Sequence, residues 1–286
     1  MSRLPPWLRT SLRTDDAFRK VQGRLAGSRL HTVCESAKCP NRVECWNRGT
    51  ATLMILGAVC TRRCGFCAVP SGRPVPPDPG EPERVGRLAG SLGLRHVVIT
   101  SVTRDDLPDG GASVFAETIH AIRRRAPGAT VEVLTPDFHA SGEQVSTVLD
   151  AGPDVFAHNL ETVRRLQPTV RPQASYETSL STLRLAAARA AAAIKSGLML
   201  GLGEEPEEIL EAFRDLRAAG CEWLTLGQYL APTPGHFPVA RFVPPEEFEQ
   251  YANAARALGF TEVASGPRVR SSYRAGDMIR PAAAGA

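Results

Sequence analysis

The chain of 286 residues carries a net charge of +4, with 43% hydrophobic and 22% charged residues, which excludes a predominantly disordered, collagen-like or low-complexity protein. No apolar run approaches the ~18–20 residues that cross a bilayer, and the N-terminus has no apolar signal core, so we expect no membrane association and a cytoplasmic location. The basic residues are scattered along the sequence, so we expect no nucleic-acid partner.

Short apolar, β-branched runs alternate with longer amphipathic stretches along most of the chain. They predict strands at 52–58, 96–102, 131–135, 154–159, 197–202 and 223–228. Helices are predicted at 81–92, 112–125, 141–149, 161–166, 176–194, 206–219 and 245–258. Near-continuous apolar strands are typical of a parallel sheet that is covered on both faces. Six β-then-α units therefore predict an α/β fold whose sheet is rolled into a full or partial barrel.

In such a fold, the functional residues lie in the loops after the carboxyl ends of the strands. Cysteines follow the first predicted strand, and polar residues or glycines follow the others: 103–106, 136–137, Asn159, 203–204 and Tyr229. Residues 1–50 contain three further cysteines and too few apolar residues for a core of their own. We expect that segment to pack on the barrel or to be held by metal.

The cysteine after the first strand begins a group of three, Cys60, Cys64 and Cys67, with spacing C-x3-C-x2-C. Three thiolates on one short loop can hold three corners of a [4Fe–4S] cluster and leave its fourth iron open to a small molecule. Zinc is the alternative, but its structural sites usually have four ligands. Seven cysteines are an odd number, which argues against a closed disulfide framework.

The pattern C-x3-C-aromatic-C, with Phe66 before the last cysteine, resembles the radical S-adenosylmethionine (SAM) superfamily. The resemblance implies that a reduced cluster cleaves SAM to a 5′-deoxyadenosyl radical, which removes hydrogen from an unactivated carbon. Acid–base residues cannot deprotonate an alkane, so such chemistry needs a cofactor.

A second group of three cysteines, Cys34, Cys39 and Cys45, precedes the first with spacing C-x4-C-x5-C. We interpret it as the ligand set of a second cluster. A zinc site or a group of three redox-active cysteines are the alternatives. The seventh cysteine, Cys221, stands apart and is expected to pack structurally.

The two cysteine patterns together resemble the lipoyl synthase family. The likeness continues through seven segments in order: 49–57, 97–107, 131–138, 158–163, 195–204, 224–230 and 264–273. It implies a partial (β/α)6 TIM-type barrel of the radical SAM class at 51–260, with extensions at 1–50 and 261–286 packed on it. It also implies that Ser272, in the motif Arg-Ser-Ser-Tyr, is the fourth ligand of the auxiliary cluster.

The resemblance implies a sulfurtransferase with two [4Fe–4S] clusters and SAM. Sulfur would be inserted at C6 and C8 of an octanoyl group carried on a lysine of a lipoyl carrier domain, with the auxiliary cluster as sulfur donor. The implied partners are 2-oxoacid dehydrogenase E2 subunits, the glycine cleavage H protein, and an electron donor such as ferredoxin or flavodoxin.

SAM is polar at both ends and needs polar partners in its pocket. The candidates, each weighed against a purely structural role, are Phe66, Thr103, Arg104, Asn159, Glu161, Gly203 and Glu204. Arg104 would meet the carboxylate of SAM. Gly203 has no Cβ and would allow the backbone to approach the adenine of SAM.

Two other functions remain open at this point. A non-catalytic electron carrier or zinc scaffold would have saturated metal sites and no SAM binding. A biotin-synthase-like enzyme would insert sulfur into a free small molecule, although the second cysteine group before the barrel argues against it.

Overall fold

The computed structural model describes residues 4–9, 13–48 and 50–279. Its centre is one eight-stranded sheet in which the strands follow one another in chain order, from β1 to β8. The strands are β1 (His31–Thr32), β2 (Thr52–Ile55), β3 (His96–Ser101), β4 (Thr130–Leu134), β5 (Val155–Ala157), β6 (Ala193–Leu200), β7 (Trp223–Gln228) and β8 (Glu262–Gly266). β1 is antiparallel to β2, and all later neighbours are parallel.

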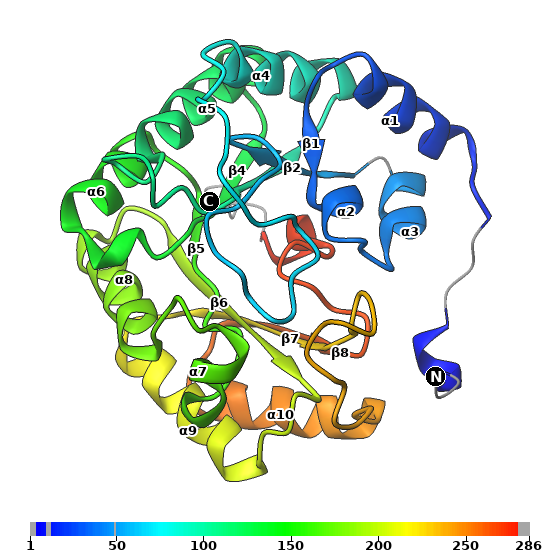
Figure 1. The fold of residues 1–286 in the computed structure, drawn as a ribbon, viewed down its shortest axis with the longest axis vertical. Helices are drawn as coiled ribbons and strands as arrows, with labels where there is room; N and C mark the ends of the chain where they lie inside the picture. The colour runs from blue at the N-terminus through cyan, green and yellow to red at the C-terminus, as the bar shows by residue number, and fades with distance from the viewer. Residues whose placement is uncertain (1–3, 10–12, 49, 280–286) are drawn as a thin grey trace, which may run out of the picture.

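The sheet curves into an incomplete barrel with helices around its outside (Figure 1). The helices are α1 (Asp16–Ala26), α2 (Val33–Ser36), α3 (Arg42–Asn47), α4 (Glu81–Leu92), α5 (Ala112–Arg125), α6 (Gly142–Asp150), α7 (Gln167–Val170), α8 (Tyr176–Arg189), α9 (Pro206–Ala218) and α10 (Pro245–Ala257). Short 3-10 helices lie at Pro6–Leu8 (η1), Phe138–Ala140 (η2), Arg164–Leu166 (η3) and Ala275–Met278 (η4). Among the described residues, no pairing joins β8 back to β2.

Local sequence explains where the outer helices begin and end. α9 begins with Pro206 in its first turn, and Glu205 and Glu208 form a reciprocal capping box there. α4 ends at Gly93, whose left-handed φ of 64° suits a residue without a Cβ. α4 buries an apolar stripe and packs on β2, all four residues of which are buried. This packing confirms the predicted α/β fold class.

Two of the predicted helices differ in the structure. The predicted helix 176–194 was wrong at its end: α8 stops at Arg189, Ala190 adopts a left-handed φ of 48°, and β6 starts at Ala193. The alanine-rich run favours helix by propensity, but pairing with β5 and β7 overrides it. The predicted helix 161–166 is instead a bend that leads into η3.

The sheet also has two strands that the periodicity did not indicate. β1 has only two residues, and every residue of β8 is only partly buried, so neither shows a clear apolar pattern. β8 pairs with β7 from Trp223 to Gly227, so residues from the C-terminal extension continue the barrel sheet. No helix in the described part of the chain is both long and apolar enough to span a membrane.

Candidate active site

A cavity of about 1560 Å³ occupies the open barrel and receives both groups of cysteines. Its lining also includes residues 269–277 of the C-terminal segment. The cysteines that line it are Cys34, Cys39, Cys45, Cys60, Cys64 and Cys67, and none of them forms a disulfide. The two cysteine motifs therefore share one internal space, as expected if they serve one reaction.

The loop with Cys60, Cys64 and Cys67 is held in place by backbone contacts. The amide of Gly65 donates to the carbonyl of Val170 at 2.8 Å, and the carbonyl of Gly65 accepts from the amide of Phe237 at 2.8 Å. The Cys60 sulfur accepts from the amide of Thr103 at 3.3 Å. Thr103 thus meets the cysteine loop through its backbone. Burial raises the pKa of the Cys67 thiol to about 11, so binding of iron as thiolate would release a proton.

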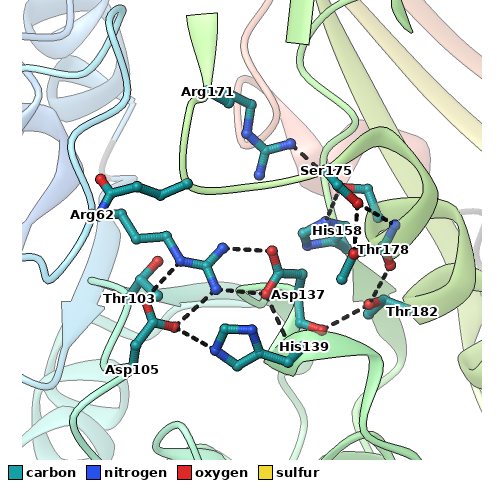
Figure 2. Close-up of polar contacts among 12 residues, drawn as sticks. Arg62, Thr103, Asp105, Asp137, His139, His158, Arg171, Ser175, Thr178 and Thr182 are labelled. Atoms are coloured by element: carbon teal, nitrogen blue, oxygen red, sulfur yellow. Dashed lines mark hydrogen bonds and ion pairs between the residues drawn. The ribbon is translucent and has the colours of Figure 1, made fainter. Parts of the chain in front are cut away.

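Arg62, which lies between two of these cysteines, anchors the loop through a buried ion-pair network (Figure 2). Its side chain is 5% exposed and donates to Asp137 at 2.5 Å and to Asp105 at 2.8 Å. His139 lies 3.0 Å from the other side of Asp105. Burial acts to raise the pKa of Asp137, but the hydrogen bonds and charge of Arg62 outweigh it and hold that pKa at about 2. Sequence reasoning missed Arg62, although its position inside the cysteine motif was a signal.

The second group of cysteines lies on the short helices α2 and α3, against the C-terminal segment. Burial, followed by the charges of Cys34 and Cys39, raises the pKa of the Cys45 thiol to about 12, so the three sulfurs lie near one another. The hydroxyl of Ser272 accepts from Thr52 Oγ1 at 2.7 Å. The backbone of the same Thr52 hydrogen-bonds the Cys34 sulfur. Ser272 therefore lies beside this cysteine group.

Polar residues from the loop after β5 lie between the two groups. Asn159 Nδ2 donates to Glu161 Oε1 at 3.1 Å and to Ser271 Oγ at 2.5 Å. Glu161 has a left-handed φ of 71°, which its two backbone bonds to Gly197 and Met199 of β6 maintain. Burial raises the pKa of Glu161, and the charge of Arg171 opposes that shift.

The buried polar atoms at this cavity that have no hydrogen-bond partner within the described ranges include Asn159 Oδ1 and Arg171 Nε. Such atoms are costly unless something pairs with them. The guanidinium of Arg171 is also close enough to Cys64 to lower its thiol pKa against the effect of burial. This donor set fits a small zwitterionic ligand next to the first cysteine group, and Arg171 is a residue that sequence reasoning missed.

Of the predicted SAM contacts, Phe66, Thr103, Asn159 and Glu161 line the cavity. The other three do not. Arg104 is buried, forms a bidentate pair with Asp106 and donates to the carbonyl of Leu56.

Glu204 accepts the amides of Gly201 and Leu202 at 2.5 and 2.9 Å and so closes the turn after β6. Gly203 has a φ of +107° in the same turn. These positions serve the local fold around the site.

The seventh cysteine lies apart from the cavity. Cys221 is fully buried, and its thiol donates to the carbonyl of Trp223 at 3.2 Å. Burial raises its thiol pKa to about 12. This environment matches the expected packing role.

The donor chemistry fits iron–sulfur clusters better than a single ion. Within the described residues, no three His, Cys, Asp or Glu side chains converge closely enough to hold one metal ion. A cubane cluster is a larger object, and each thiolate binds a different corner. Asn159 and Arg171, each with an unpaired polar atom, line the same cavity as these three thiols.

Comparisons with known proteins agree with this geometry. A family model of the radical SAM superfamily matches residues 54–216, and a model of the N-terminal domain of lipoyl synthase matches residues 1–39. A lipoyl synthase from Rubrobacter xylanophilus is 54% identical over 99% of this chain and 88% of its own length. One from Thermus thermophilus is 58% identical over 95% of this chain and 85% of its own length.

Solved structures show the same fold at low identity. The hydrogenase maturase HydG from Carboxydothermus hydrogenoformans superposes with a TM-score of 0.57 at 12% identity, over 86% of this chain and 70% of its own. Methylornithine synthase superposes with a TM-score of 0.52 at 15% identity, over 77% and 73%. With a matched superfamily model over more than half its length and curated relatives above 50% identity, this chain belongs to the lipoyl synthase family of the radical SAM superfamily.

Proposed function

We propose that this chain inserts two sulfur atoms at C6 and C8 of an octanoyl group attached to a lysine of a lipoyl carrier domain. Membership of the family makes it a radical SAM sulfurtransferase that uses SAM and a [4Fe–4S] cluster. The convergence of both cysteine groups and Ser272 on one cavity carries the finer proposal.

Cys60, Cys64 and Cys67 would hold the SAM cluster, and Asn159 and Arg171 line the same cavity. When bound and reduced, the cluster and SAM supply a radical that can remove hydrogen from an unactivated carbon. The chain's own contribution is to bind and orient. Asn159 and Arg171 offer unpaired polar atoms, and the apolar lining keeps water from the reacting carbon.

Further contacts to SAM are proposed for Phe66, Thr103 and Glu161, which line the same cavity. Thr103 lies at the cysteine loop itself, and the half-buried Glu161 carboxylate offers an acceptor for hydroxyl or ammonium donors. Arg104, Gly203 and Glu204 would support the site indirectly because they lie outside its lining.

Cys34, Cys39, Cys45 and Ser272 would hold a second cluster that donates sulfur. A serine oxygen is a hard ligand on a sulfide-rich centre, so it can exchange more readily than thiolate when sulfur is removed. In this arrangement residues 1–50 and 261–286 supply the auxiliary centre, and residues 51–260 supply the SAM centre.

The proposed partners are octanoylated carrier domains of 2-oxoacid dehydrogenase E2 subunits and of the glycine cleavage H protein, with ferredoxin or flavodoxin as electron donor. A cytoplasmic location is also proposed, and seven free cysteines support it. Incubation with an octanoylated carrier domain, SAM and reductant, followed by mass spectrometry, should show two added sulfurs on the carrier. Sulfur insertion into free octanoate but not into the carrier would contradict the proposal.

The two cysteine groups can be separated by variants. Anaerobic reconstitution with iron and sulfide should load about eight irons per chain, and a plateau near four would contradict the two-cluster proposal. Cys60→Ala should abolish 5′-deoxyadenosine formation. Cys34→Ala should retain some of it but transfer no sulfur.

The adjacent serines provide a matched pair. Ser272→Ala should resemble Cys34→Ala in losing sulfur transfer, although three thiolates could still retain a cluster. Ser271→Ala should be milder because its hydroxyl bonds Asn159 and not Thr52. If Ser271→Ala were the more damaging change, the assignment of Ser272 as ligand would be wrong.

A further inference from the structure

The proposed auxiliary centre is assembled from opposite ends of the chain. Its three cysteines lie between residues 34 and 45, whereas Ser272 follows the last strand, β8. Figure 1 shows α2 and α3 next to the C-terminal segment that contains η4. Because the cysteines alone cannot position the serine, other side chains must hold these two segments together.

Glu44, directly before Cys45 on α3, lies at the contact between these two segments. Its carboxylate accepts from Tyr273 Oη at 2.5 Å, from Arg268 Nη1 at 3.0 Å and from Arg274 Nη2 at 3.3 Å. The Glu44 side chain is 23% exposed, so these charge-assisted bonds are partly shielded from water. One carboxylate thus binds the C-terminal segment on both sides of Ser272.

A second contact between the segments supports the same docking. The buried amide of Asn41 donates through Nδ2 to the carbonyl of Arg268 at 2.6 Å. Asn41 lies between Cys39 and Cys45. The cysteine segment therefore holds Arg268 through both its side chain and its backbone.

Neighbouring residues of the C-terminal turn have separate partners. Tyr273 bonds Glu44, while the hydroxyl of the preceding Ser272 bonds Thr52, next to the cysteine group. Consecutive Cα atoms are only about 3.8 Å apart, so fixing Tyr273 restricts the position of Ser272 closely. A single weak oxygen ligand benefits from such preorganisation because the ordering entropy of its segment is lost before it binds.

We propose that Glu44 is a positioning residue that docks residues 268–274 onto the cysteine segment and so places Ser272 at the auxiliary centre. The inference rests on the proposed function, because it takes Ser272 as a ligand of that centre. It assigns no chemistry to Glu44 itself. We call this docking contact the Glu44 clamp. Its loss should hold Ser272 less firmly at the auxiliary centre and leave the SAM centre unchanged.

Two variants test the clamp at different strengths. Glu44→Gln keeps the shape of the side chain but removes the charge that both arginines need, and Tyr273→Phe removes one hydroxyl only. The matched control is Glu83→Gln. Glu83 is similarly exposed at 32% and also pairs with two arginines, Arg124 and Arg125, but it lies on the outer helix α4.

The first measurement is amide hydrogen exchange on the full chain, both metal-free and reconstituted. We expect exchange of residues 268–279 to be about tenfold faster in Glu44→Gln and several-fold faster in Tyr273→Phe, with β7 unchanged. Glu83→Gln should match the parent chain throughout. Unchanged exchange of 268–279 in both clamp variants would overturn the inference.

The second measurement is iron release to a chelator from each centre separately. In a background in which Cys60, Cys64 and Cys67 are alanine, Glu44→Gln should lose auxiliary iron about tenfold faster than its parent. In the reciprocal background, with the second cysteine group replaced, its iron release should not change. Equal release in the first background would overturn the clamp even if Ser272→Ala still abolished sulfur transfer. If the parent chain loaded only four irons, the proposed function itself would fail.

Discussion

Replacing Asp137 by Asn should show how much the buried network under the cysteine loop contributes to stability. Asp137 is 2% exposed and bonds both terminal nitrogens of Arg62. The variant keeps one acceptor oxygen, but its amide nitrogen faces the donors of the guanidinium. Arg62 would keep only the Asp105 carboxylate as a charged partner.

The size of the effect follows from the pKa of Asp137, which lies at about 2 instead of the usual 3.8 of an aspartate. That difference corresponds to about 2 kcal/mol of folding free energy at neutral pH. Removing one partner of a buried pair usually costs about 3–5 kcal/mol, and the remaining Asp105 should reduce that cost. We therefore expect Asp137→Asn to lose about 2–3 kcal/mol.

Urea unfolding of the metal-free chain under reducing conditions, followed by circular dichroism, would measure this loss as a shift of the midpoint. The matched control is Asp105→Asn, which affects the same arginine at a site that is 30% exposed, and it should cost less than about 1 kcal/mol. Because the folded pKa of Asp137 is depressed, its contribution exists above pH 3.8 and disappears as the pH falls toward 2. If the two variants lost equal unfolding free energy, the buried Arg62–Asp137 pair would not contribute more than the Arg62–Asp105 pair, and the reasoning would be refuted.

Three other perturbations test separate features of the barrel. Burial, followed by the charge of Arg171, lowers the pKa of His158 from 6.5 to about 4, so the free energy of unfolding should fall by about 3 kcal/mol as the pH drops through that interval. His158→Gln should remove most of this slope in urea titrations at several pH values. Lys195→Met should cost about 3–5 kcal/mol because it leaves Glu132 charged and buried, and adding Glu132→Leu should recover most of the loss. Gly227→Ala would drive a Cβ into the carbonyl oxygen of Val269, just before Ser272, so hydrogen exchange of that segment should accelerate. An unchanged rate would contradict this close approach.

The sequence alone determined the fold class and the chemistry that it supports. Alternating apolar strands and amphipathic helices report which faces are buried, and that pattern predicted the parallel barrel. The spacing of Cys60, Cys64 and Cys67 after the first long strand is local, so their convergence on one loop was predictable. Similarity in motif order extended the prediction to Ser272 as a cluster ligand. In the structure Ser272 bonds Thr52, whose backbone contacts Cys34.

Only the tertiary structure decided which distant side chains meet. Arg104 follows a strand, as a site residue should, yet its guanidinium turns to Asp106 and away from the cavity. The partners of Arg62 and Glu44 lie 75 and 229 residues away in the sequence, so no local pattern predicts these contacts. The hydrophobic periodicity of a sequence indicates whether a residue is buried, but it does not indicate which residues it packs against. The curvature of the barrel brings the two ends of the chain together, and this long-range packing determines the neighbours of each cysteine group.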